Sequence, residues 1–509
     1  MSKIKRYAAL LILAAAVVGC SNDSSSDGSG GEAEQELTYA STSDVVGLSP
    51  IDTNDSVSAA MIGQIYETLF TRDPETMEIE TLLAESYENP DERTWEIKLK
   101  EDITFHDGTP FNAEAVKYTF EEFVDEDRAA PRASLLAPIE SIEAVDEYTV
   151  EITTEEPYGA LLAALAHTNA AIVSPEADQN QDINEDPVGT GPFKFENWSQ
   201  GEEVTLSKNE DYWQEPAELE NVTMKVVPEY STAVSMLETG EVQFIDAVPT
   251  EHLSRVENID GIEVDKKDGT PVYSLGFNFD KEPYNELEFR QAVSYAIDRE
   301  AYVSQLNGLG IENESIIGPE VFGYGEDAAD AGYSFDPEKA QEIIKENGYG
   351  DEEITLLTAN REAYTRMAEV VQSQLSEVGL NVSIESMEWG TFLDTTPTGE
   401  FDMTFTSWSN STADGSEHLY PNLHSDNIDS SNWVRYNNEE FDQLVDESRS
   451  EVEQGVREEK LQEANMIAVE DAAWIPMHHG VVSAAYDESI KGLELDPTGQ
   501  WYLYNVSRE

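Results

Sequence analysis

The sequence has very few residues that could crosslink it or neutralise its charge. Its 509 residues include one cysteine, Cys20, so no disulfide can form within the chain. Lysine and arginine number 29 against 105 aspartates and glutamates, a net charge of −76. Such a surface repels nucleic acid and anionic lipid headgroups. The acids spread along the whole chain, which is typical of an exported protein from a saline or alkaline habitat. A charge adapted to a cationic ligand is the alternative.

Motifs of covalent catalysis are also missing. The chain contains no Gly-x-Ser-x-Gly, no Walker phosphate loop and no complete Gly-x-Gly-x-x-Gly. The run GTGPF (189–193) lacks a following Lys-Ser/Thr and predicts a turn. Among the seven histidines only His478 and His479 are adjacent, and strand neighbours point to opposite faces. We therefore expect no metal, no cofactor and no enzymatic activity. A hydrolase stays an alternative, because carboxylate pairs are too numerous to single one out.

The N-terminus predicts export. Basic residues in the first six positions precede an apolar run (7–18), which is too short to span a bilayer. The sequence Val-Val-Gly-Cys at its end resembles a bacterial lipobox, in which Cys20 becomes the lipidated first residue. Residues 1–20 are then a lipoprotein signal peptide, and the Ser/Gly/acidic run 21–36 is a flexible tether. A chance cysteine after an ordinary signal is the alternative.

Hydrophobic periodicity predicts a mixed α/β body starting near Leu37. In residues 94–111, Trp95, Ile97 and Leu99 alternate with charged residues, which indicates a half-buried strand. Residues 148–154 alternate likewise. The run 336–348 has the marks of a helix, with Asp336 as N-cap, proline in the first turn and a terminal glycine. A chain of this length exceeds one hydrophobic core, so two or three lobes are expected.

Six segments, in order, resemble the solute-binding proteins (family 5) of bacterial ABC importers for peptides, nickel and related solutes. They are WEIKLKEDITFHDGTPFNAEAV (95–116), PVGTGPFKFENW (187–198), NEDYW (209–213), LGFNFDKEPYNELEFRQAVSYAIDR (275–299), DPEKAQEIIKENGY (336–349) and AAWIPMHH (472–479).

This resemblance implies the two-lobed type II periplasmic-binding-protein fold (large, cluster C) with an extra subdomain. Lobe I would comprise residues 37–272 and 487–509, with the subdomain inserted at approximately 70–185. Lobe II would comprise 273–486, reached through hinge strands at 271–280 and 481–487. The ligand would lie between the lobes, and an ABC permease and ATPase would be the partners. We expect a monomer on the extracytoplasmic face of the cell membrane, attached only through its lipid.

The stretch WSNSTADGSEHLYPNLHS (408–425) is most similar to the glutathione-binding branch of this family. A short peptide brings an ammonium group, and an enclosed ammonium needs a fixed carboxylate. The resemblance implies Asp414 for this role, with Glu417 as the second choice. Ser411 and Thr412 can supply hydroxyl hydrogen bonds, and Trp408 a flat wall.

The ligand carboxylate needs a cation, and Arg361 before a predicted helix is the candidate in lobe II. Position within the family places Trp389 and Tyr66 at the cleft wall, and His167 and Asn169 at its border. Each candidate also has a purely structural interpretation, as a loop acid, turn former, core aromatic, surface ion pair or buried histidine. Glutathione is the favoured ligand; di- or oligopeptides, a nickel chelate, heme or an oligosaccharide are alternatives, as is an adhesin or signalling receptor of the same fold.

Overall fold

The computed structural model describes residues 35–509, apart from the side chains of residues 362 and 363. The predicted signal peptide, the predicted lipidation site Cys20 and nearly all of the predicted tether lie outside the described residues. Strand β1 (Glu36–Ser41) begins at the last residue predicted for the tether. Within residues 35–509, no helix combines the length and apolar character needed to cross a membrane.

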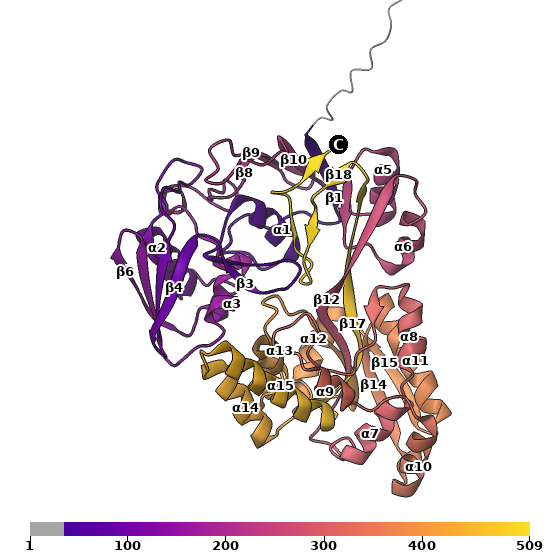
Figure 1. The fold of residues 1–509 in the computed structure, drawn as a ribbon. Coiled ribbons are helices and arrows are strands. Elements are labelled where there is room, and N and C mark those ends of the chain that lie inside the picture. Colours follow the sequence, from indigo (N-terminus) through magenta and orange to yellow (C-terminus); the bar gives the residue numbers. More distant parts are fainter. Residues whose placement is uncertain (1–34) are drawn as a thin grey trace, which may run out of the picture. The chain divides into compact units, whose positions relative to one another are not determined.

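One eleven-stranded sheet runs through the described chain (Figure 1). Strands β14 and β1 pair in parallel with both of their neighbours, whereas most of the remaining pairs are antiparallel. Short β13 (Gly310–Ile311) pairs with β17 beside the main path. The strand order is β15 (Asn381–Met387), β14 (Glu353–Ala359), β16 (Met403–Trp408), β12 (Ile262–Phe277), β17 (Trp474–Asp487), β11 (Phe244–Asp246), β1, β10 (Asn221–Val226), β9 (Glu203–Lys208) and β8 (Phe193–Ser199).

The two longest strands, β12 and β17, lie at the middle of this order and connect its two halves. They pair antiparallel, from Ile262 opposite Asp487 to Gly276 opposite Trp474. We use "lobe I" for residues 35–261 with 488–509 and "lobe II" for residues 278–473; the two strands pass between them. The crossings between the lobes were predicted at residues 271–280 and 481–487. Strand β12 begins before the first of these ranges, at Ile262, and β17 begins before the second, at Trp474.

Lobe I carries a separate four-stranded antiparallel sheet, which Figure 1 shows to one side of the main sheet. Its order is β4 (Ala84–Asp91), β5 (Thr94–Leu99), β7 (Thr149–Thr154) and β6 (Ile139–Asp146). Three short pairs complete the strands: β2 (Phe70–Arg72) with β3 (Ile79–Thr81), β18 (Ile490–Lys491) with β21 (Ser507–Arg508), and β19 (Glu494–Leu495) with β20 (Trp501–Tyr502).

The helices follow the same division. Lobe I contains α1 (Ser56–Ile65), α2 (Ala113–Val124), α3 (Leu161–Leu165), α4 (Pro175–Asn180), α5 (Tyr230–Thr239) and α6 (Thr250–Val256). Lobe II contains α7 (Leu287–Ala296), α8 (Arg299–Val303), α9 (Glu326–Asp330), α10 (Pro337–Asn347), α11 (Glu362–Glu377), α12 (Trp389–Thr395), α13 (Gly415–Leu423), α14 (Glu439–Ser450) and α15 (Gln454–Glu470).

The local sequence patterns are confirmed where burial and capping decide them. Trp95, Ile97 and Leu99 are buried on one face of β5, and β7 alternates in the same way. In α10, the Asp336 side chain accepts a hydrogen bond from the backbone of Lys339, and Gly348 ends the helix at a φ of 80°. Separate hydrophobic cores form within each lobe. The lobe limits inferred from the family resemblance stay a prediction.

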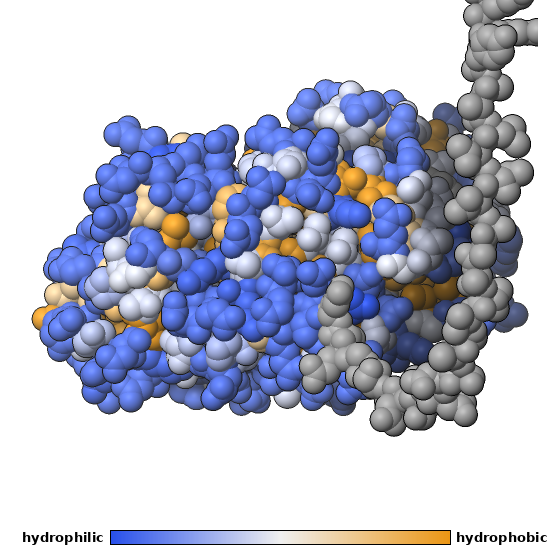
Figure 2. Space-filling view, turned by 90° about the horizontal axis from the view of Figure 1, so that it is seen from above, coloured by the Kyte–Doolittle hydropathy of each residue, from blue (hydrophilic) through white to orange (hydrophobic). Residues whose placement is uncertain are grey.

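Hydrophilic residues predominate on the face that Figure 2 shows, as the composition leads us to expect. Lobe I nevertheless contains enclosed carboxylates, and Glu67 is one that lies within its core. It accepts hydrogen bonds from Tyr212 Oη at 2.7 Å, and from Trp213 Nε1 and Thr190 Oγ1 at 2.8 Å. Burial raises the pKa of Glu67 to about 7, although these donors and Lys100 oppose the shift.

Glu67 should therefore make folding pH-dependent. A glutamate in the unfolded chain ionises at about pH 4.3, whereas Glu67 in the folded protein ionises at about pH 7. The contribution of protonated Glu67 to the free energy of unfolding is therefore full below the unfolded pKa and is lost as the pH rises through the folded pKa. The loss is on the order of a few kcal/mol. Urea unfolding should show the parent weakening relative to Glu67→Gln between pH 4 and 8, with Glu218→Gln at an exposed position as the control. A constant difference between parent and variant would refute this role.

Candidate ligand-binding site

A cavity of about 340 Å³ lies where segments of the two lobes meet. Lobe I supplies most of its lining, together with Thr270 of β12 and one loop that follows β16 in lobe II. The main lining segments are Thr53 to Ser56, Arg72, Arg132, Ala166 to Asn169, Ser409 to Ser411, and alternate residues from Asp496 to Tyr502.

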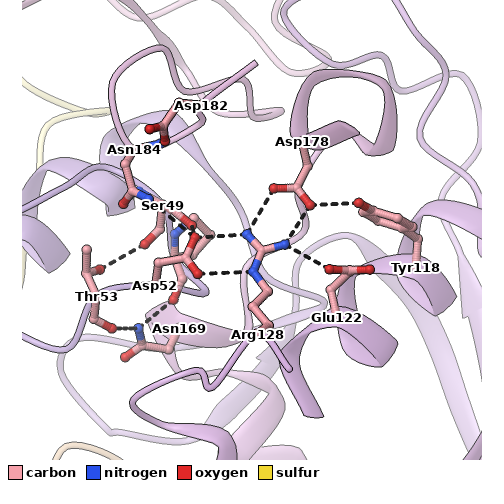
Figure 3. Close-up of polar contacts among 11 residues, drawn as sticks. Ser49, Asp52, Thr53, Tyr118, Glu122, Arg128, Asn169, Asp178, Asp182 and Asn184 are labelled. Carbon is pink, nitrogen blue, oxygen red and sulfur yellow. Dashed lines mark hydrogen bonds and ion pairs between the residues drawn. The ribbon is translucent and has the colours of Figure 1, made fainter. Parts of the chain in front are cut away.

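The loop that leads into α1 is held by a network around Arg128 (Figure 3). The Arg128 guanidinium binds Asp178 through two nitrogens at 2.6 and 2.9 Å, and Asp52 through two at 2.9 and 3.0 Å. It also reaches Glu122 at 3.1 Å. Burial alone would raise the pKa of Asp52, but hydrogen bonds from Arg128 and Ser49 outweigh it and hold the pKa below its usual range.

Asn169 fixes the same loop from the other side. Its Nδ2 donates to the carbonyl oxygens of Pro50 and Thr53 at 2.6 and 2.7 Å, as Figure 3 shows for Thr53. These bonds and the Arg128 network hold the backbone that carries Asp55 into the cavity lining. Asn169 is itself almost completely buried. Its side chain therefore stabilises the loop that lines the cavity.

Two guanidinium groups give one part of the cavity a positive charge. Arg132 Nη2 donates to Ser411 Oγ of lobe II at 2.8 Å and lies 3.4 Å from Glu417 Oε1. Arg72 donates to the carbonyl oxygen of Ala163 at 3.0 Å, and within residues 35–509 it forms no ion pair. Burial lowers the pKa of Arg72 because it disfavours the charged form.

Two acids from lobe I line the cavity and differ in what they already bind. Asp496 accepts bonds from the Thr498 hydroxyl at 2.7 Å and from backbone N–H groups, and its other oxygen accepts one from Tyr502 at 3.3 Å. Asp55 caps α1 by accepting from Ser58 N at 2.9 Å. In the described part of the chain, Asp55 Oδ2 is buried and has no partner. Asp55 is thus the acid able to receive a ligand cation.

The structure places some of the predicted site residues together. His167, Asn169 and Ser411 line the cavity. Glu417 lies next to it, where one oxygen faces Arg132 and the other accepts a bond from the backbone of Thr412 at 2.9 Å and one from its hydroxyl. Glu417 and Thr412 therefore hold each other within lobe II. Whether any of these residues binds a ligand stays a prediction.

Asp414 is in a different environment from the one predicted. It caps α13, its side chain is buried, and its Oδ1 lies 2.5 Å from Arg457 Nη2. Burial opposes its ionisation, but Arg457 outweighs burial and keeps the pKa of Asp414 below its usual range. Asp414 is therefore buried and already neutralised by Arg457 in this structure, and its role as partner of a ligand ammonium stays a prediction.

Four further candidates lie outside the lining of this cavity. The Arg361 guanidinium stacks on Trp389, 3.6 Å from the ring centroid, at the start of α11. Tyr66 is buried in the lobe I core, where its hydroxyl accepts a bond from Val188 N at 3.1 Å. Trp408 packs against a lobe II core, and its buried Nε1 has no partner among the described residues.

Sequence reasoning missed Arg72, Arg132, Asp55 and Asp496. The scarcity of basic residues was the signal for the two arginines, but it was applied only to lobe II. Asp55 carries the Asx N-cap pattern of a helix start, which conceals its free oxygen. Within residues 35–509, no group of three or more His, Cys, Asp or Glu side chains is arranged to hold a metal ion.

Comparison with known proteins shows which family this chain resembles in sequence and in fold. The model of bacterial extracellular solute-binding proteins, family 5 (middle region), matches residues 78–430. The glutathione-binding protein GsiB of Escherichia coli O1:K1 is 30% identical over 479 residues, 91% of this chain and 93% of that protein. HbpA2 of Haemophilus parasuis has a TM-score of 0.87 at 26% identity, covering 93% of this chain and 100% of that one. DppA of Helicobacter pylori, in complex with peptide STSA, has a TM-score of 0.75 at 28% identity, covering 93% and 98%.

Asp414→Ala should lower the free energy of unfolding by about 3–5 kcal/mol, because it leaves Arg457 buried without a counter-charge. Urea unfolding would measure this loss. Adding Arg457→Met to Asp414→Ala should cost less than the sum of the two single changes. The control is Asp429→Ala, which breaks an exposed pair with Arg435 and should cost about 0–1 kcal/mol. Unchanged stability in Asp414→Ala would restore the exposed-loop interpretation.

Proposed function

Because the chain belongs to family 5 of the bacterial extracellular solute-binding proteins, we propose that it is the receptor of an ABC importer for a short peptide, with glutathione the favoured ligand. Proteins of this family bind solutes outside the cytoplasm and work with a permease and an ATPase. They are binding proteins rather than enzymes. The observation that carries the ligand class is the cavity, whose lining includes, among the described residues, the guanidinium of Arg72 without an ion pair and a carboxylate oxygen of Asp55 without a partner.

A zwitterionic peptide suits these two groups. Each is only partly exposed, and a buried charge or acceptor without a partner costs free energy that a complementary ligand group recovers. Glutathione is favoured among peptides because of the relative named as a glutathione-binding protein. A longer peptide is the second candidate, favoured by the solved relative that holds the peptide STSA.

We further propose that the protein is a monomer, anchored through a lipid on Cys20 and free of other membrane contact. The tether, of which residues 21–34 lie outside the described part, would let the body stand away from the bilayer. Binding would shift the lobes toward a closed arrangement that the importer recognises.

The ligand assignment can be tested with purified protein lacking residues 1–20. Mass spectrometry should detect a short peptide released on unfolding, and calorimetry on protein stripped of ligand should then measure saturable binding of reduced glutathione. N-acetylation should weaken binding of either glutathione or a tripeptide, because it removes the ammonium that Asp55 would receive. If the protein binds tetrapeptides such as STSA but does not bind glutathione, a longer peptide replaces glutathione as the favoured ligand. If the protein binds no peptide, the proposed function is rejected.

The anchor can be tested separately. Cys20→Ala should leave the folded body unchanged while releasing it from the membrane fraction or blocking signal processing. Fractionation of cells that express each protein would measure this, with circular dichroism as the control for folding. Unchanged attachment of the variant to the membrane would rule out a lipid on Cys20.

A further inference from the structure

His167 presents a hydrogen-bond donor at the cavity. Its Nδ1 lies 3.1 Å from the backbone N–H of Asn169, which can only donate, so Nδ1 must accept. Burial, with the nearby charges of Arg132 and Arg72, lowers the pKa of His167 to about 3, so the ring is neutral at pH 7. A neutral imidazole whose Nδ1 accepts carries its proton on Nε2.

The neighbour of this Nε2–H group is another donor. Arg132 Nη2 lies 3.5 Å away, and a guanidinium nitrogen cannot accept a hydrogen bond. The two groups therefore point donors toward the same space and cannot satisfy each other. An acceptor that approaches both nitrogens would satisfy the Nε2–H group of His167 and would compete with Ser411 and Glu417 for Arg132 Nη2.

Arg72 adds a second positive charge to the same region. It lowers the pKa of His167 together with Arg132, and like both it lines the cavity. In residues 35–509 its nearest carboxylates lie beyond ion-pair distance, although 105 of the protein's residues are acidic. Arg128 and Arg457 are paired with carboxylates. Arg290, which is buried in lobe II, donates to two backbone carbonyl oxygens and has no ion pair in the described chain, so what distinguishes Arg72 is its place in the cavity lining.

We propose that Arg72, Arg132 and His167 form an anion subsite on lobe I that binds a carboxylate of the ligand. This deepens the proposed function, on which it rests. With the ligand carboxylate held here and its ammonium at Asp55 Oδ2, the peptide has one orientation in the cavity. The subsite also explains how an anionic group can bind inside a protein of net charge −76: two local cations oppose the long-range repulsion.

Glu417 occupies this subsite only partly. Its Oε1 is 3.4 Å from Arg132, long for a charge-assisted bond, and Thr412 holds its other oxygen. A ligand carboxylate would compete with Glu417 for Arg132. The alternative role of Glu417, as partner of the ligand ammonium, predicts the opposite effect on binding when its charge is removed.

Calorimetry with a matched set of ligands and variants tests the subsite. The ligands are reduced glutathione and its diethyl ester, and Ala-Ala-Ala and its C-terminal amide. The variants are Arg72→Gln, Arg132→Gln and Glu417→Gln, with Arg255→Gln at an exposed ion pair as the control. Arg72→Lys and Arg132→Lys keep the positive charge but remove the planar guanidinium that can bind a carboxylate through two nitrogens. Thermal melts establish that each protein is folded.

Arg72→Gln and Arg132→Gln should each raise the Kd of the free acids about 30-fold or more. The parent protein should bind the ester and the amide more weakly than the free acids by the same factor. The losses should not add, because both changes remove the same contact. Glu417→Gln should tighten binding of the free acids and leave the ester and amide unchanged. Arg255→Gln should match the parent.

Two results would overturn the subsite while leaving the proposed function intact. One is a parent protein that binds ester and free acid equally. The other is fully additive losses, which place the carboxylate elsewhere. Weaker binding in Glu417→Gln would assign Glu417 to the ammonium instead. The proposed function is judged apart from these, by whether the parent binds any of the free peptides.

Discussion

The antiparallel pairing of β12 with β17 is the constraint on which the site depends. These strands carry the chain between the lobes, and their register shifts between Asp268 and Val272. At that irregularity Gly269 lies so close to the other strand that a Cβ would come within 2.9 Å of Gly480 O. The next residue, Thr270, donates its N–H to Pro497 O of lobe I and its hydroxyl to Asn410 O of lobe II. The cavity forms where these two loops meet.

The arginines near the cavity and in the lobe cores differ in what they bind. Arg128 is surrounded by three carboxylates and Arg457 is paired with Asp414, so both act within their own lobe. Arg72 has no such partner in the described chain, and Arg132 reaches its partners across the lobe boundary. Buried Arg290 also has no ion pair in the described chain, but it does not line the cavity. The place of Arg72 in the cavity lining, together with its lack of a paired carboxylate among the described residues, supports the anion subsite that we propose.

The sequence was sufficient for elements that local patterns determine. Alternating hydrophobicity predicted β5 and β7, and the cap residues Asp336 and Gly348 predicted both ends of α10. The family resemblance added the class of fold. The environment of Asp414 was not predictable in this way, because its partner Arg457 is 43 residues away and comes close only through the packing of α13 and α15. A loop acid that will be buried and one that will meet a ligand have the same local sequence signal.

The same limit applies to the cavity, whose charged groups come from distant parts of the chain. Arg132 and Ser411 are 279 residues apart, so only the tertiary fold brings them together. Asn169 appeared in the sequence as a residue at the cleft border, and the structure gives it a more specific role. Its side chain holds the carbonyls of Pro50 and Thr53, next to Asp55, while its backbone N–H sets the tautomer of His167.

Asn169 thereby connects the acidic and the basic ends of the cavity. The distance between the two ends determines which ligands can place an ammonium on Asp55 and a carboxylate at Arg72 and Arg132 simultaneously. The loop that carries Asp55 is held by the Arg128–Asp52 ion pair and by bonds from the Asn169 side chain to two backbone carbonyls. In the binding mode that we propose, selection of ligand length would depend on the rigidity of the loop 50–55 and of the turn 167–169, which the Arg128 network and Asn169 hold.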